Sequence, residues 1–225
     1  MWCVPRLDEA YIVAMEDVLA TYERPYDARN PVVCLDEKPL VLHGEARSGS
    51  AARPGRSARR DYEYVRHGTA NAFCAVEPKA GRHFAWVTPN RGGSHFAGTL
   101  FRLAMAYPEA ETIHLVMDNL NIHRQKALVD CFGEEMGAEL WSCFTVHHTP
   151  KHASWLNQAE IEISLYARQC LGKRRIPDLK TVRRETAAWL RGINREKIKI
   201  NWNFTRKAAR KLFAYQRITS RRSKD

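Results

Sequence analysis

Two stretches of the sequence decide the fold: Val32-Val33-Cys34-Leu35-Asp36-Glu37 and Thr112-Ile113-His114-Leu115-Val116-Met117-Asp118-Asn119. Each is a short apolar run that stops at an acidic residue. Runs of this length that are rich in β-branched residues favour buried strands over helices. We therefore expect two strands that end at Asp36 and Asp118. The ends of neighbouring parallel strands are where α/β sheets form their active sites.

The segments around these strands predict the remaining elements. Apolar residues at helical spacing predict helices over 8–23, 94–107, 124–136, 178–191 and 205–215, and a helix after Ser154, with Ser94 and Ser154 as N-caps. Alternation predicts strands over 70–76, 83–87 and 139–146, the first two joined by a turn at 78–81. This order of elements predicts an α/β fold with a mixed central β-sheet flanked by helices.

The balance of charge points to a polyanionic partner. The 225 residues contain 36 Lys+Arg and 25 Asp+Glu, a formal net charge of +11. Residues 168–225 alone hold 19 basic and four acidic side chains, or +15, whereas residues 1–167 sum to −4. A solvated surface is the alternative for a short basic run, but it explains 58 residues poorly. A second basic segment, Gly44–Arg60, is rich in Gly, Ser and Arg and is predicted to be a mobile loop.

Six cysteines, never closer than twelve residues apart, exclude a CxxC redox site or a zinc ribbon and fit a reducing compartment. The first residues do not show the basic and apolar pattern of a signal peptide, and no apolar run reaches membrane-spanning length, so we expect neither feature. We expect a protein of the bacterial cytoplasm, associated with the nucleoid and with no membrane partner.

Three acids stand out by their positions. Asp36 and Asp118 follow buried strands, and Glu160 lies on the helix after the last strand. Any one of them could be an ordinary turn or cap residue. Three carboxylates brought together need a cation, and Mg²⁺ prefers carboxylate and water oxygens. Two such ions about 4 Å apart support in-line phosphoryl displacement. The pattern therefore predicts metal-dependent phosphodiester chemistry, with Mn²⁺ able to replace Mg²⁺.

Four segments, in this order, resemble the catalytic domain of DDE transposases, and specifically the 630 group of bacterial insertion sequences in the mariner-like superfamily. They are Cys34-Leu35-Asp36-Glu37-Lys38-Pro39, Tyr64 with Gly68-Thr69-Ala70-Asn71, Met117-Asp118-Asn119-Leu120-Asn121-Ile122-His123, and Thr149-Pro150-Lys151-His152-Ala153-Ser154-Trp155-Leu156-Asn157-Gln158-Ala159-Glu160.

The resemblance implies an RNase H-like fold and a Mg²⁺-dependent DDE superfamily endonuclease that carries out cut-and-paste DNA transposition into TA targets. Asp36, Asp118 and Glu160 then form the catalytic and metal-binding triad. Glu162 is the competing third acid, but it lies about 200° around a helix from Glu160. The resemblance further implies a homodimer bound to transposon ends and target DNA.

Further residues have weaker claims on the site or on DNA. Glu37 is expected to point away from the pocket or to contact the loop. Asn157, three residues before Glu160, supports the assignment of Glu160 as the third acid. A zinc cluster of His147, His148 and His152 is less favoured than phosphate contact or a loop role. Trp155 is interpreted as a core anchor, with base stacking as the alternative. The remaining candidates are Asn119, Asn121 and His123 for orientation, Lys151 for phosphate, and Arg47, Arg53, Arg56, Arg59, Arg60, Lys173, Arg174 and Arg175 for nucleic acid.

The pattern predicts a connecting helix and linker over 1–31, a catalytic domain over 32–175 and a basic helical C-terminal extension over 176–225. The family's helix-turn-helix units are not found before the first acid, so an upstream reading frame could supply them as a partner. Two alternatives remain: a truncated, non-catalytic DNA-binding remnant that modulates a full-length transposase, and a structure-selective nuclease on the same fold.

Overall fold

A computed structural model describes residues 7–59 and 61–215 of the chain, and a five-stranded sheet in the order β3-β2-β1-β4-β5 forms its centre. The first three strands pair antiparallel, whereas β4 runs parallel to β1 and β5 parallel to β4. The predicted mixed sheet is confirmed. The strands are β1 (Val32–Glu45), β2 (Tyr64–Glu77), β3 (Arg82–Thr88), β4 (Ile113–Met117) and β5 (Phe144–His148).

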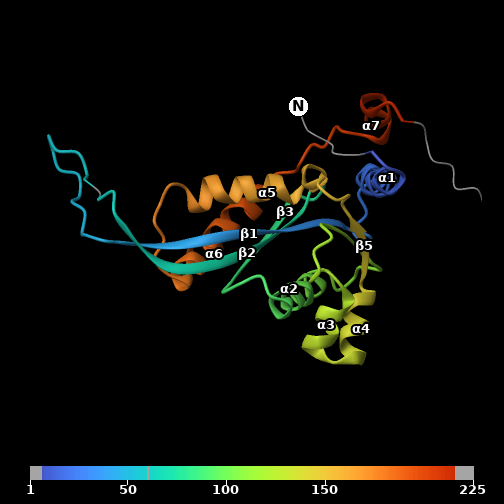
Figure 1. Cartoon of the computed structure of the whole chain (residues 1–225), viewed down its shortest axis with the longest axis horizontal. Coiled ribbons are helices and arrows are strands. Elements are labelled where there is room, and N and C mark those ends of the chain that lie inside the picture. The colour runs from blue at the N-terminus through green and yellow to red at the C-terminus, as the bar shows by residue number, and fades with distance from the viewer. Residues whose placement is uncertain (1–6, 60, 216–225) are drawn as a thin grey trace, which may run out of the picture.

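Helices flank the sheet, with α2, α3 and α4 on one side, α5 and α6 on the other, α1 near β5, and α7 beside α1 (Figure 1). Among the described residues, none of these helices is long and apolar enough to cross a membrane. Their bounds are α1 (Glu9–Glu23), α2 (Gly93–Met105), α3 (Gln125–Phe132), α4 (Glu134–Ser142), a short 3₁₀ turn (Ser154–Leu156), α5 (Ala159–Tyr166) with a π-helical continuation (Ala167–Leu171), α6 (Leu179–Glu196) and α7 (Arg206–Phe213).

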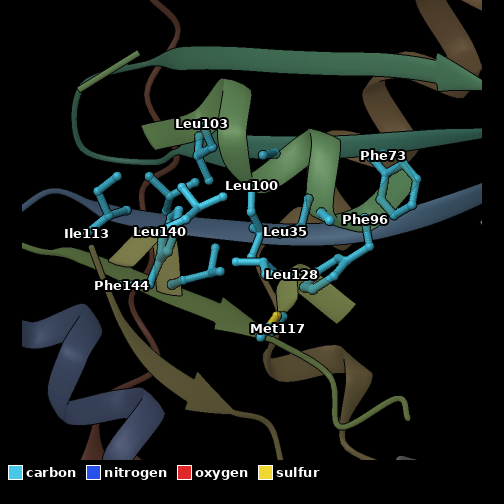
Figure 2. Close-up of a cluster of buried hydrophobic side chains, with 14 residues drawn as sticks. Leu35, Phe73, Phe96, Leu100, Leu103, Ile113, Met117, Leu128, Leu140 and Phe144 are labelled. Atoms are coloured by element: carbon cyan, nitrogen blue, oxygen red, sulfur yellow. The ribbon is translucent and has the colours of Figure 1, made fainter. Parts of the chain in front are cut away.

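The pleat of β1 divides the core between the two faces of the sheet. Val33 and Leu35 pack into the larger cluster beneath α2 and α3, which Figure 2 shows with Phe96, Leu100 and Leu128 around Leu35. Cys34 points to the opposite face and joins the cluster under α1 and α7. Because side chains alternate along a strand, Asp36 is directed to the same face as Cys34, and Glu37 to the face of Leu35.

β1 does not end at Asp36, contrary to expectation. Its antiparallel pairing with β2 runs from Cys34 opposite Val76 to Glu45 opposite Tyr64. Only the parallel pairing with β4 stops early, at Cys34 opposite Val116. Asp36 therefore lies just past the point where β1 and β4 separate. The other expectation was correct, because β4 ends at Met117 and Asp118 follows it.

Residues 46–59 of the predicted loop Gly44–Arg60 lie outside the named strands, but its first two residues do not. Gly44 and Glu45 belong to β1, and backbone bridges join Ser50 to Arg59 and Arg53 to Arg56. We refer to residues 46–59 and 61–63 as the arm; it projects from the end of β1 and the start of β2 (Figure 1). Its Gly, Ser and Arg content predicted a loop, and the two bridges add backbone pairing that requires no apolar side chains. Arg60 lies outside the described residues.

A glycine explains why the predicted helix over 124–136 is two helices. Gly133 has a φ of 88° and separates α3 from α4, a backbone conformation that other residues rarely adopt. Gly137 then packs so closely that a Cβ would lie 2.6 Å from the Val129 backbone. As a result α4 includes Glu139–Ser142, which had been assigned to a strand, and β5 starts only at Phe144.

The predicted N-caps were wrong at two helices. Gly92 precedes α2, so Ser94 lies inside the first turn, and Ser154 opens a separate 3₁₀ turn rather than α5. Asp178 and Thr205 do accept hydrogen bonds from the first turns of α6 and α7.

Candidate active site

The site forms where β1, β4 and α5 approach one another. Asp36 lies two residues beyond Cys34, and Asp118 two residues beyond Val116, so the pleat directs both towards the same side of the sheet. The Asn157 side chain donates a hydrogen bond to the Leu35 carbonyl at 2.9 Å, which ties the start of α5 to β1.

Asp36 is held in a partly buried, negatively charged environment. Burial raises its pKa to about 7, and the charges of Glu37, Glu160 and Asp118 act in the same direction. The backbone N–H of Glu37 donates to Asp36 Oδ1 at 2.7 Å, and Asn157 Nδ2 lies 3.5 Å from Oδ2. No cationic side chain pairs with Asp36 among the described residues. Asp36 therefore carries a charge that no described cation balances, and Asp118 and Glu160 are near enough to affect it electrostatically.

Asp118 has a cationic neighbour in its own loop. His123 Nδ1 lies 2.7 Å from Asp118 Oδ1, and His123 Nε2 lies 2.7 Å from Glu37 Oε1. Burial disfavours the charged imidazole, yet the hydrogen bonds to Asp118 and Glu37 raise the pKa of His123 to about 10. Burial likewise acts against the Asp118 carboxylate, but His123 holds its pKa below the usual value. Glu37 does point away from Asp36, as expected.

The two acids of α5 have different surroundings. Glu160 is exposed, and its carboxylate is hydrogen bonded to none of the described side chains. Glu162 is buried and lies 2.7 Å from His83 Nδ1, while His83 Nε2 contacts the Ile198 carbonyl at 3.1 Å. Sequence reasoning did not single out His83. Its place among apolar residues in β3 was the available signal, since a histidine on a buried strand needs a polar partner.

The loop between β5 and α5 is fixed by aromatic packing. Trp155 is half buried, with its ring 5.5 Å from Phe204 and 6.3 Å from Phe213 at the chain's C-terminal region. These contacts agree with its interpretation as a core anchor. Lys151 and His152 are exposed in the same loop, and His152 has a φ of 63°. Asn119 and Asn121 are exposed in the loop after β4.

His147, His148 and His152, for which a zinc cluster is the less favoured interpretation, do not converge. His147 bridges Asp17 of α1, at 2.7 Å, and His114 of β4, at 3.0 Å. His148 lies 3.2 Å from the Asp118 carbonyl. The cluster of metal-ligand type within the described residues is instead Glu37, Asp118 and His123, whose ligand atoms lie within 4.8 Å of one another.

The basic candidates differ in availability. Arg175 stabilises the two ends of the arm, because its guanidinium donates hydrogen bonds to the Glu45 carboxylate and to the main-chain carbonyls of Asp61, Tyr62 and Glu63. Arg174 pairs with Glu185, and Arg47 with Asp61 and Glu63. Lys173 is exposed. Arg53, Arg56 and Arg59 are exposed along the arm, and among the described residues they make backbone pairs within it but no ion pair.

Comparison with known proteins places this geometry in context. A family model described as DDE superfamily endonuclease matches residues 31–183, which include all three acids. None of the curated proteins compared with the chain matches it.

Solved structures of the Mos1 mariner transposase share the fold. The paired-end complex with Mn aligns with a TM-score of 0.55 and 17% identity over 88% of this chain and 63% of the other. The strand transfer complex aligns with a TM-score of 0.53 and 16% identity over 88% of this chain and 61% of the other. The paired-end complex with Mg aligns with a TM-score of 0.50 and 17% identity over 88% of this chain and 63% of the other. The chain thus spans less than two thirds of each Mos1 chain. The likeness confirms the predicted RNase H-like fold.

We predict that Asp36→Asn stabilises the metal-free protein at pH 8. An aspartate whose folded-state pKa is about 7 has a higher affinity for protons when folded, so its ionisation lowers stability as pH rises from about 4 to about 7. The variant should gain about 1–3 kcal/mol in free energy of unfolding at pH 8 and almost nothing near pH 4. Urea titrations at both pH values measure this; an equal effect at both would contradict it.

We also predict opposite behaviour for the two acids of α5. Glu162→Ala leaves His83 buried without its partner and should lower the free energy of unfolding by about 2–4 kcal/mol. Glu160→Ala removes an exposed side chain and should change it by no more than about 0.5 kcal/mol. Chemical denaturation of both variants provides the comparison, and similar losses would refute the assigned burial.

Proposed function

This chain belongs to the DDE superfamily of endonucleases, and on that premise we propose that it is a transposase catalytic domain that cleaves DNA strands and transfers them to a target. The observations that carry the proposal are the positions of Asp36 and Asp118 just beyond the paired residues of β1 and β4, and the electrostatic effect of Asp118 and Glu160 on Asp36, which pairs with no cation among the described residues. The Mos1 structures with the same fold include a strand transfer complex. A cut-and-paste reaction into TA dinucleotides and membership of the 630 group are the finer parts of this proposal.

The donor set fits a hard divalent cation. Asp36 and Glu160 offer carboxylate oxygens, and Asp118 Oδ2 accepts no hydrogen bond among the described residues, since His123 and the Leu120 N–H both use Oδ1. We propose that these three residues hold Mg²⁺, or Mn²⁺ in its place, as two ions per site; bound ions would activate the attacking oxygen and stabilise the leaving one. Related structures contain Mn or Mg.

The surrounding residues would orient this donor set. Asn157 holds the start of α5 against β1, and the packing of Trp155 fixes the preceding loop. Lys151, His152, Asn119 and Asn121 are exposed beside the site, where they could contact the DNA backbone. Arg53, Arg56 and Arg59 give the arm a positive surface suited to phosphates.

Partners and location are further parts of the proposal. We propose a homodimer on transposon ends in the bacterial cytoplasm, with helix-turn-helix units supplied by an upstream frame. The catalytic domain would comprise residues 32–175, with 1–31 as its connecting segment and 176–225 as a basic extension. The alternative, a non-catalytic remnant that modulates a full-length transposase, predicts DNA binding without cleavage.

Nicking of supercoiled plasmid tests the proposed reaction. With Mn²⁺ or Mg²⁺ the wild-type chain should nick the plasmid, and Asp36→Asn, Asp118→Asn and Glu160→Gln should each reduce the rate at least about 100-fold, since each loses a metal ligand. Glu134→Gln, an exposed acid of α4, is the control and should retain the rate. DNA binding without nicking by the wild type would favour the remnant; nicking that survives all three substitutions would exclude the triad.

Salt dependence tests the arm. Replacing Arg53, Arg56 and Arg59 together by Gln should weaken plasmid binding and reduce the slope of log affinity against log salt by up to about 3, because each phosphate contact contributes about 0.9. The control removes the same charge elsewhere: Arg29, Arg102 and Lys126 to Gln. Equal slopes for wild type and arm variant would remove the arm from the DNA interface.

A further inference from the structure

The loop that follows β4 folds back on its own first residue. The Leu120 N–H donates to Asp118 Oδ1 at 3.3 Å, and the His123 N–H to the Leu120 carbonyl at 2.9 Å. These two bonds bring the His123 ring back to Asp118, where Nδ1 lies 2.7 Å from Oδ1 and 3.0 Å from the main-chain carbonyl. The His123 ring therefore contacts both the carboxylate and the main-chain carbonyl of Asp118.

The other edge of the ring meets a second strand. His123 Nε2 lies 2.7 Å from Glu37 Oε1, and Glu37 is adjacent to Asp36 in β1. Both the imidazole and the Glu37 side chain are almost completely buried, at 0% and 3% exposure, whereas Asp118 retains 36%. Carboxylate oxygens accept hydrogen bonds but donate none, so an imidazole between two of them donates from both nitrogens. Such charge-assisted bonds are short and directional.

The core holds the ring in this orientation. The Phe96 side chain of α2 is fully buried and lies 4.7 Å from the His123 ring centroid, at an interplanar angle of 31°. The His123 ring is thus held between Glu37 of β1, Asp118 after β4 and Phe96 of α2, which restricts its orientation. Of the three side chains Asp118 retains the most exposure, and its Oδ2 accepts no hydrogen bond from the described residues.

We propose that Glu37 and His123 are positioning residues: the Glu37–His123 bridge fixes the carboxylate of Asp118 so that its free oxygen faces the metal site. The inference rests on the proposed function, because it assigns Asp118 to that site. Glu37 acts only through His123, and neither residue is a metal ligand. The bridge also links the two strands from which Asp36 and Asp118 come, so the relative position of these two acids depends on it.

Mn²⁺ affinity of the DNA-free protein is the main test. Loss of a group that orients a ligand typically weakens metal binding 10–100-fold. We expect Glu37→Gln and His123→Gln each to weaken Mn²⁺ binding by about that factor, and the double variant to be no weaker than His123→Gln alone. His147→Gln is the matched control: it removes another buried histidine that pairs with a carboxylate at 2.7 Å, and should leave affinity unchanged.

A spectroscopic readout separates positioning from direct ligation. Pulsed EPR of the Mn²⁺-loaded wild type should show no coupling to a histidine nitrogen. Such a coupling, or loss of Mn²⁺ binding in both single variants as complete as in Asp118→Asn, would make the cluster of Glu37, Asp118 and His123 itself the metal site and overturn the inference. Wild-type affinity in His123→Gln would also overturn it.

The same measurements distinguish the two proposals. Metal binding and nicking by the wild type, with unchanged Mn²⁺ affinity in His123→Gln, would overturn the bridge and leave the proposed function intact. A wild-type chain that neither binds Mn²⁺ nor nicks DNA would overturn the proposed function, and the bridge's role in metal binding with it. Thermal midpoints of all variants identify any that fail to fold. If His123→Gln does not fold, His123→Asn, which preserves one donor near Asp118, takes its place and should bind Mn²⁺ more weakly than the wild type.

Discussion

The burial of a carboxylate beside other carboxylates at the junction of β1 and β4 is the constraint on which the rest of the site depends. Burial raises the pKa of Asp36 to about 7, and the charges of Glu37, Glu160 and Asp118 act in the same direction. Folding must supply the free energy to keep like charges together, and the cores on either side of the sheet supply it through apolar burial. A site that is costly without a cation is one that binds a cation well.

Two buried His–Glu pairs, His83 with Glu162 and His123 with Glu37, flank the acids and have a similar effect on them. His83 lies beside Glu162, which directs this acid of α5 into the protein and leaves Glu160 at the surface. His123 takes Glu37 in the same manner on the opposite face and reaches Asp118 as well. In both cases an imidazole removes from the pocket a carboxylate that would add to its negative charge. The pairs thus determine which of five acids remain available.

The C-terminal part of the described chain and α1 contribute to the proposed site by packing against the loop before α5. Phe204 and Phe213 come from the last segment of the described chain, yet they pack on Trp155, five residues before Glu160. Arg210 of α7 pairs with Glu16 of α1, so both terminal helices stabilise this region together. The loop that precedes Glu160 therefore packs against residues more than 40 positions away in sequence.

The sequence by itself determined the α/β order, the buried strand before each aspartate, and the candidate acids, because these depend on local apolar patterns and on short motifs. Composition predicted the loop at the arm but not its two backbone bridges, and the apolar pattern did not show that Gly133 separates two helices, so that β5 starts only at Phe144. Only the tertiary structure decided that β1 continues past Asp36 while its pairing with β4 stops, and that His123 joins Glu37 to Asp118. Those outcomes depend on contacts between residues about 80 positions apart, and no local pattern encodes which distant partner a buried polar group will find.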